Sequence, residues 1–140
     1  MNTESLRKFT TEPFPFAKLL GLELVTMTPD RVEAVLRVRE DLCTRPAVLH
    51  GGAVMALADT VGGIATLANL AEGATTTTIE SKTNFFAAVP VGDTVRAECT
   101  PLHRGRTTMV WQTKVTRSDG RVAALVIQTQ LVIPAPQEPK

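Results

Sequence analysis

The chain has no tyrosine, few aromatic residues, no excess of either charge and no segment suited to crossing a membrane. Aromatic residues make up 4% of its 140 residues, so a platform for stacking single-stranded bases is not expected. The formal net charge is +1 and no basic stripe is present, which argues against binding to nucleic acid or to a membrane surface. The longest weakly charged stretch, residues 49–70, is rich in glycine and alanine and contains His50 and Asp59, so it is a poor membrane span.

Cysteine is also scarce. Cys43 and Cys99 are far apart and form no CxxC pair, and residues 1–11 contain no apolar core of a signal peptide. Two isolated cysteines fit a reducing compartment better than a disulfide scaffold. We therefore expect a cytoplasmic protein, with both cysteines packed as small hydrophobic residues, and we predict no metal site.

The composition is that of an ordinary globular protein. Hydrophobic residues make up 44% and charged residues 21% of the chain. This length allows one domain with a sizeable core. We predict a single domain over residues 1–140, with residues 1–11 and 134–140 as flexible tails.

The expected secondary structure is β-rich, with one long helix. A short helix or turn is expected at residues 13–20, where Phe14, Phe16, Leu19 and Leu20 would supply apolar contacts. Strands are expected at 22–27 and 32–38, followed by a loop at 40–48 without regular structure. A helix should span residues 51–70 and end at Gly73. Four strands should follow, at 75–86, 94–102, 107–117 and 121–133, the last two joined at Asp119-Gly120.

This order predicts the α+β class, with an antiparallel β-sheet wrapped around one long central helix. The helix is apolar or small on nearly all sides, which is typical of a helix inside something larger. A single small sheet with one helix would leave apolar surface exposed. We therefore expect the chain to form a homo-oligomer.

Asp59 is the single ionisable residue of the predicted helix. A carboxylate in an apolar helix is costly unless it is paired or reaches solvent. Gly62 and Gly63 lie three and four positions further on, and each costs about 1 kcal/mol relative to alanine in a helix. Close approach of another backbone or of a ligand would compensate for that cost. Asp59 is therefore a candidate functional residue, and a structural aspartate bonded to a neighbouring segment is the alternative.

The start of the same helix offers a second candidate site. Gly51 and Gly52 would present unpaired backbone N–H groups, aided by the helix dipole, to a developing oxyanion. His50 would flank this site, although a histidine at a helix start more often makes a structural hydrogen bond than acts as a base.

The segment His50-Gly51-Gly52, with Asp59 nine residues after the histidine, resembles the HGG-x6-D/E signature of PaaI-type hotdog thioesterases. The resemblance extends from about residue 20 to residue 133. It implies the hotdog fold and an acyl-CoA thioesterase that needs no cofactor, because coenzyme A is part of the substrate. It also implies a small-molecule substrate as the binding partner.

The resemblance implies roles for several catalytic residues. Asp59 would be the nucleophile, or the general base that activates water against the thioester, and the resemblance leaves both open. The Gly51 N–H would polarise the thioester carbonyl. Thr78 matches a position where the family often has a hydroxyl near the reacting water. The run of four threonines at 75–78 has a simpler explanation too, since threonine is a good strand former.

The resemblance also implies which residues bind the substrate. The segment 103–106 matches a basic segment near the nucleotide end of coenzyme A, where arginine suits phosphate. A solvated hairpin turn is the alternative for each arginine. An apolar groove beside the long helix would accept an aromatic or medium-chain acyl group. The residues expected to bind substrate are Gly52, Met55, Gly62, Gly63, His103, Arg104, Gly105 and Arg106.

Two positions depart from the family pattern. Thr44 stands six residues before His50, where many members have Asn or Gln to position the carbonyl or the water. A threonine has a shorter reach than either amide and a single hydrogen-bond donor. Ala47 stands where a glycine is common.

The resemblance further implies dimers with joined sheets and active sites built from both chains, and then a tetramer of two dimers. Two other functions remain open. The chain would be a hotdog hydratase or dehydratase if it reversibly hydrated an enoyl thioester. It would be a non-catalytic acyl-CoA-binding domain if it bound acyl-CoA without hydrolysing it.

Overall fold

The computed structural model describes residues 12–139, which form one antiparallel sheet, one long helix and a few short elements. The predicted tail at 1–11 lies outside these residues. Residues 134–139 contain no helix or strand. The six-stranded sheet has the order β1-β2-β6-β7-β8-β5. Its strands are β1 (Glu23–Thr28), β2 (Arg31–Arg37), β5 (Thr75–Phe85), β6 (Thr94–Arg104), β7 (Thr108–Thr116) and β8 (Val122–Ile133).

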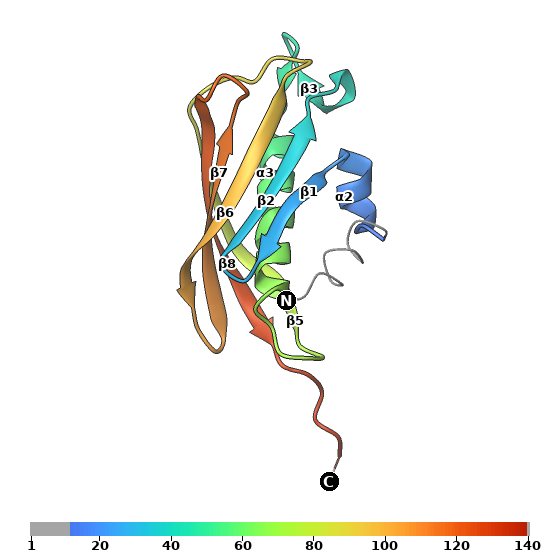
Figure 1. Cartoon of the computed structure of the whole chain (residues 1–140), viewed down its shortest axis with the longest axis vertical. Coiled ribbons are helices and arrows are strands. Elements are labelled where there is room, and N and C mark those ends of the chain that lie inside the picture. Colours follow the sequence, from blue (N-terminus) through green and yellow to red (C-terminus); the bar gives the residue numbers. More distant parts are fainter. Residues whose placement is uncertain (1–11, 140) are drawn as a thin grey trace.

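The long helix α3 (Gly51–Leu67) runs along one face of this sheet, as Figure 1 shows. Alternate strand residues point toward α3 and are buried, as the period of two in their sequence predicts. On β2 these are Val32, Ala34 and Leu36, with no exposed surface. One long helix against an antiparallel sheet is the predicted α+β hotdog fold, which is therefore confirmed.

The face of α3 toward the sheet is packed, and the opposite face is open. Leu57, Val61 and Ile64 are completely buried against the sheet. Met55 on the other face is 42% exposed, and Asp59 lies beside it. The expectation that α3 lies inside a larger assembly stays a prediction, and this open face is the surface that a second copy of the chain would cover. Within residues 12–139, the chain has no second layer to cover that face.

The helix also ends earlier than predicted. It stops at Leu67, with Ala68 as the C-terminal cap, and Gly73 lies in the following turn with a φ of 78°. The side chain of Asn69 accounts for the early end. Its amide donates to the Ala65 carbonyl and to the Pro29 carbonyl, both at 2.9 Å. The amide thus occupies a terminal helix carbonyl and ties this end of α3 to the turn between β1 and β2.

The segment predicted as an irregular loop at 40–48 has regular structure. It contains a 3-10 turn, η1 (Glu40–Leu42), and two short paired strands, β3 (Cys43–Thr44) and β4 (Val48–Leu49). Short strands such as these lack the repeated alternation by which sequence reveals longer ones. Between them Ala47 adopts a φ of 82°, in the left-handed region that favours glycine. This conformation explains why a glycine is common at this position in the PaaI-type family that the sequence resembles.

The short helix α2 (Pro15–Leu20) lies at the edge of the molecule beside α3. Its C-terminal carbonyls are held by Arg39, whose guanidinium donates to the Leu20 carbonyl at 2.6 Å and to the Leu19 carbonyl at 3.1 Å. Leu20 is buried, but Phe14 and Phe16 are 42% and 54% exposed. The expected apolar contacts of these phenylalanines with the core are therefore only partial.

Candidate active site

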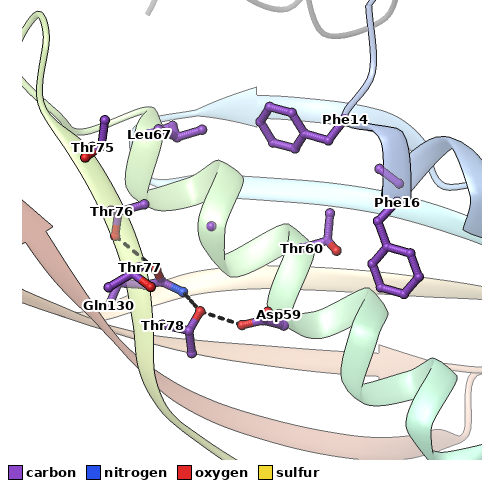
Figure 2. A pocket seen from close by; sticks show the side chains of 12 residues that line it. Phe14, Phe16, Asp59, Thr60, Leu67, Thr75, Thr76, Thr77, Thr78 and Gln130 are labelled. Carbon is purple, nitrogen blue, oxygen red and sulfur yellow. Dashed lines mark hydrogen bonds between the residues drawn. The ribbon is translucent and has the colours of Figure 1, made fainter.

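Asp59 lies halfway along the open face of α3, with its carboxylate directed at Thr78 on β5 (Figure 2). The Thr78 hydroxyl donates to Asp59 Oδ1 at 2.6 Å, a length typical of a hydroxyl bonded to a carboxylate. No other hydrogen bond to this carboxylate is found within residues 12–139. The structure thus brings together two predicted catalytic residues that lie on different elements.

Two glutamines behind Thr78 were not among the predicted site residues. Gln130 on β8 donates from its amide nitrogen to Thr78 Oγ1 at 2.6 Å and to Gln128 Oε1 at 2.6 Å. Gln128 donates in turn to the backbone carbonyl of Ala58, the residue before Asp59, at 2.8 Å. A signal for both existed in the sequence. Gln128 and Gln130 are polar residues on the buried face of an otherwise apolar strand, where polar side chains need partners.

A pocket of about 430 Å³ lies at this carboxylate. Figure 2 shows α3 between two walls, the threonine run of β5 on one side and, on the other, Phe14 just before α2 and Phe16 within it. The pocket therefore joins a carboxylate and hydroxyls to apolar side chains. The lining residues are Phe14, Phe16, Ala17, Asp59, Thr60, Gly63, Leu67, Thr75, Thr76, Thr77, Thr78 and Gln130.

The two adjacent helix glycines have different surroundings. Gly63 lines the pocket, and a Cβ atom added there would have no neighbour within 4 Å. Gly62 is buried, and a Cβ atom there would lie 2.2 Å from Gln128 Nε2. The prediction that Gly62 lines a substrate groove is therefore wrong. Because Gly62 has no side chain, the Gln128 amide can lie against the helix there. The group that approaches Gly62 closely is therefore a protein side chain, whereas another backbone or a ligand was expected. Met55 lies on the open face of α3 but is not among the residues that line this pocket.

At the start of α3, His50 caps the helix. Its Nδ1 accepts a hydrogen bond from the Gly52 N–H at 2.7 Å, so the Nε2 atom carries the proton of a neutral ring. The Gly52 N–H is thereby occupied, and it is not a free oxyanion donor as the sequence suggested. The Gly51 N–H donates no hydrogen bond within the described part of the chain. Of the two predicted backbone donors, Gly51 alone remains available.

Gly51 lines a separate apolar hollow. Its wall is formed by Leu49, Phe85, Phe86, Ala87 and Ala88, and the Phe85 ring lies against Gly51. Phe85 and Phe86 are 53% and 56% exposed, so in the single chain they are surface residues. Thr44 lies near this end of α3, paired with Val48 in the small sheet, and is exposed.

The predicted catalytic residues therefore form two groups. Thr44, His50 and Gly51 lie at the N-terminus of α3, while Asp59 and Thr78 lie at its middle. Asp59 is eight positions after Gly51, which is about 12 Å along a helix that rises 1.5 Å per residue. That separation is too large for both residues of one chain to touch one thioester group.

The basic segment 103–106 lies at the far end of α3. Arg104 donates to the Pro29 carbonyl at 3.0 Å and forms an ion pair with Asp30 at 2.7 Å. Gly105 sits in the tight connection between β6 and β7, where a Cβ atom would lie 2.9 Å from the Thr108 carbonyl oxygen. Both have structural roles here. His103 and Arg106 are exposed, and no ion pair of theirs is found within residues 12–139.

The sequence model of the thioesterase superfamily matches residues 47–124, which include α3 and β5 and therefore Asp59 and Thr78. The chain belongs to the thioesterase superfamily. A Mycobacterium tuberculosis protein, described as a candidate esterase, is 33% identical over 113 residues, which cover 79% of this chain and 80% of the relative. The proofreading thioesterase EntH of Cronobacter turicensis is 33% identical over 102 residues, covering 73% and 74%.

The fold agrees with this assignment. A solved thioesterase from Haemophilus influenzae superposes with a TM-score of 0.87 at 28% identity, covering 99% of this chain and 94% of that one. The predicted membership of the hotdog thioesterases, and with it the prediction of a thioester hydrolase, is confirmed. No helix within residues 12–139 is long and apolar enough to span a membrane. No group of three possible metal-ligating side chains is found in that range either.

Proposed function

We propose that this thioester hydrolase is an acyl-CoA thioesterase, which releases a free acid and coenzyme A. The observation that carries the proposal is the Asp59 carboxylate, hydrogen-bonded by Thr78 at 2.6 Å in a pocket that also has apolar walls. A thioesterase-like protein of Streptococcus pneumoniae, solved with coenzyme A, shares the fold at a TM-score of 0.75 and 23% identity. That likeness supports coenzyme A as the thiol carrier.

The reaction needs a nucleophile and a polarised carbonyl. As general base, Asp59 takes a proton from water while the water oxygen bonds to the carbonyl carbon. The carbon–sulfur bond then breaks, and the thiolate leaves and takes up a proton. As nucleophile, the carboxylate would itself bond to the carbon and form an anhydride, which water then opens. In both routes the Gly51 N–H would stabilise the negative charge on the carbonyl oxygen.

We propose that each active site combines two copies of the chain. The distance of about 12 Å between Gly51 and Asp59 along α3 calls for a second copy. Strand β5 is at the edge of the sheet and eleven residues long, so it is open to pairing with another β5. Antiparallel pairing about a two-fold axis near Ser81 and Lys82 would place Phe85 of one copy opposite Thr78 of the other. The Gly51 of one copy would then approach the Asp59 of its partner.

A mixing experiment tests the shared site. Gly51 is the first residue of α3, a position that tolerates proline, so Gly51→Pro removes the N–H donor with little disturbance of the helix. Asp59→Asn and Gly51→Pro should each be inactive. When the two are unfolded together and refolded as a mixture, half the dimers are mixed and half of their sites are intact. Activity should therefore return to about a quarter of wild type. A mixture that stays inactive contradicts the shared site.

We further propose that two such dimers form a tetramer. The face of the sheet away from α3 carries apolar residues on β8. Ile127 and Leu131 are 37% and 36% exposed there. Apolar patches of this kind often mark protein interfaces. Light scattering of the native protein distinguishes monomer, dimer and tetramer.

The acyl group is proposed to be aromatic or of medium length. Phe14, Phe16 and Leu67 give the Asp59 pocket an apolar side, and its volume of about 430 Å³ suits a group of that size. Release of free thiol from acyl-CoAs with short, medium, long and aromatic acyl groups measures the preference. A preference for acetyl-CoA would contradict this part of the proposal.

Arg106 is proposed to bind the phosphates of coenzyme A. It is exposed, whereas Arg104 is tied to Asp30 and Pro29. Arg106→Ala should raise the KM for CoA thioesters more than the KM for thioesters of a truncated thiol. Equal effects on the two substrates would argue against a phosphate contact.

The decisive test of the function is the Asp59→Asn variant. The amide is nearly isosteric and can still accept from Thr78, but it can neither take a proton nor attack a carbonyl. Thiol release should fall at least about a hundred-fold, the size of effect expected for a lost general base. Asp41→Asn, at an exposed aspartate that pairs with Arg39, serves as the matched control and should retain activity. Activity of the Asp59→Asn variant close to wild type overturns the assignment.

The other two functions remain as outcomes of the same assay. Reversible hydration of an enoyl thioester without thiol release would indicate a hydratase. Binding of acyl-CoA without turnover would indicate a binding domain. The cytoplasmic location is proposed on the two free cysteines, Cys43 and Cys99, which suit a reducing compartment.

A further inference from the structure

Gln128 and Gln130 form a polar pair on the buried face of β8, each with 1% of its surface exposed. Buried amides are costly unless their donors and acceptors are satisfied. Here the Gln128 amide nitrogen bonds to the Ala58 carbonyl and its oxygen accepts from Gln130. The Gln130 oxygen lies 3.0 Å from the Thr76 hydroxyl, whose single hydrogen can be donated either to it or to the Leu131 carbonyl at 2.9 Å. The pair connects the backbone of α3 to the hydroxyl that holds Asp59.

Only one orientation of each glutamine amide satisfies these hydrogen bonds. The Ala58 carbonyl can only accept, so Gln128 must present its NH₂ group there and its oxygen to Gln130. Gln130 must then present its own NH₂ group to Gln128. The second hydrogen of that NH₂ group points at Thr78 Oγ1. The reverse orientation of either amide would place two acceptors face to face.

Thr78 is at the end of this chain of bonds. Its oxygen accepts from Gln130, so its single hydrogen is directed to Asp59 Oδ1 at 2.6 Å. Without the Gln130 donor, the hydroxyl could rotate and accept from, or donate to, a water molecule instead. Asp59 lines the pocket, and within residues 12–139 its Oδ2 accepts no hydrogen bond, so this oxygen is available to a reacting water or carbonyl.

We propose that Gln130, oriented by Gln128, is a positioning residue for Asp59. Gln130 donates a hydrogen bond to the Thr78 oxygen, so the Thr78 hydroxyl must donate its own hydrogen to Asp59 Oδ1. That bond fixes the plane of the Asp59 carboxylate. This inference rests on the proposed thioesterase function. Misplacement of a reacting group by about 1 Å can cost a hundred-fold in rate, so a fixed carboxylate plane has a measurable effect.

A double-mutant cycle on kcat tests the route through Thr78. Gln130→Met removes the amide at similar volume, and Thr78→Val removes the hydroxyl. Each should lower kcat about ten-fold with KM nearly unchanged, because a tilted carboxylate slows chemistry more than it weakens binding. In the Thr78→Val background, Gln130→Met should cause less than about a two-fold further loss. Full additivity of the two losses would mean that Gln130 acts otherwise and would overturn the proposal.

The control variant is Gln112→Met, the same substitution on β7 at a glutamine outside the pocket. Its kcat should stay at the wild-type level. Wild-type thiol release and its loss in Asp59→Asn establish the proposed function separately. If those two results hold while the cycle is additive, the positioning role alone fails. If wild type releases no thiol, the proposed function fails.

A measurement on folded protein avoids reliance on the buried substitution. The side-chain amide protons of Gln130, followed by NMR, should shift between wild type and Asp59→Asn, because Thr78 links the two side chains. In the Thr78→Val background, Asp59→Asn should leave these protons unshifted. An amide of Gln130 that does not respond to Asp59→Asn would refute the inference, even if the Gln130→Met variant fails to fold.

Discussion

The neighbouring glycines of α3 predict opposite effects of one substitution. Alanine is favoured over glycine in a helix interior by about 1 kcal/mol at either position. At Gly63 the new methyl group would meet nothing within 4 Å. Gly63→Ala should therefore raise the free energy of unfolding by about 1 kcal/mol.

At Gly62 the methyl group would lie 2.2 Å from Gln128 Nε2, so the Gln128 amide must move. Its bonds to the Ala58 carbonyl and to Gln130 are then lost inside the core. A buried polar group left without a partner costs about 1–3 kcal/mol, and because both bonds are lost we take the upper value of about 3 kcal/mol. Set against the gain of about 1 kcal/mol in helix propensity, Gly62→Ala should destabilise the protein by about 2 kcal/mol.

Thermal unfolding followed by circular dichroism measures both changes. For a chain of this length, about 1 kcal/mol corresponds to roughly 3 °C in Tm. Gly63→Ala should therefore melt about 3 °C above wild type, and Gly62→Ala about 6 °C below it. The Gly62→Ala variant should also lose activity, because Gln128 orients Gln130 and thereby Thr78.

Similar shifts in the same direction at both positions would refute this reasoning. Melting at two protein concentrations tests one specific failure. If a second copy of the chain packs directly on Gly63, Gly63→Ala would weaken association. Its Tm would then fall below wild type and depend more strongly on concentration. That result would mean that Gly63 lies in an interface between two copies of the chain.

Three further predictions concern other parts of the fold. Ala47→Gly should raise the free energy of unfolding by about 1 kcal/mol in urea denaturation, because a φ of 82° strains any residue with a Cβ; an unchanged midpoint would contradict the strain. Burial raises the pKa of the Glu33 carboxyl, but attraction to Arg31 and Arg96 and hydrogen bonds from neighbouring side chains outweigh it and lower the pKa below its ordinary value. The ionised Glu33 carboxyl therefore stabilises the fold above its ordinary pKa, and this stabilisation is lost as the pH falls through the lowered pKa. In urea denaturation, wild type should be more stable than Glu33→Gln at neutral pH, and the difference should disappear below about pH 4. Burial raises the pKa of the Cys99 thiol to about 11, so at pH 8 only about one thiol in a thousand is ionised and alkylation should be slow until the protein unfolds; rapid labelling of Cys99 in native protein would contradict its burial.

Much of the fold could be predicted because its signals repeat along the chain. The alternation of Val32, Ala34 and Leu36 predicted β2 and its buried face, and the run of apolar and small residues after Gly51 predicted α3. The Asp119-Gly120 pair predicted the last hairpin, where Gly120 does adopt a positive φ of 88°. Local periodicity does not reveal short elements such as β3 and β4, nor the Asn69 side chain that ends α3 early.

The candidate site was predicted in part. Asp59 stood out because it is the single charge on an apolar helix, and Thr78 was named through the family resemblance. Gln128 and Gln130 were missed, although polar residues on the buried face of a strand are a visible signal. Gly62 and Gly52 were assigned to substrate contact, whereas the Gln128 amide fills the space at Gly62 and His50 occupies the Gly52 N–H.

The sequence by itself determined the class of fold, the isolated carboxylate and the family, because these depend on residue type and on spacing along one chain. The tertiary structure decided which groups meet. The bond between Asp59 and Thr78 joins residues nineteen positions apart, and the glutamine pair approaches α3 from a strand near the other end of the chain. Such contacts depend on the register of strands that are paired in space. The spacing of residues within one segment does not contain that register.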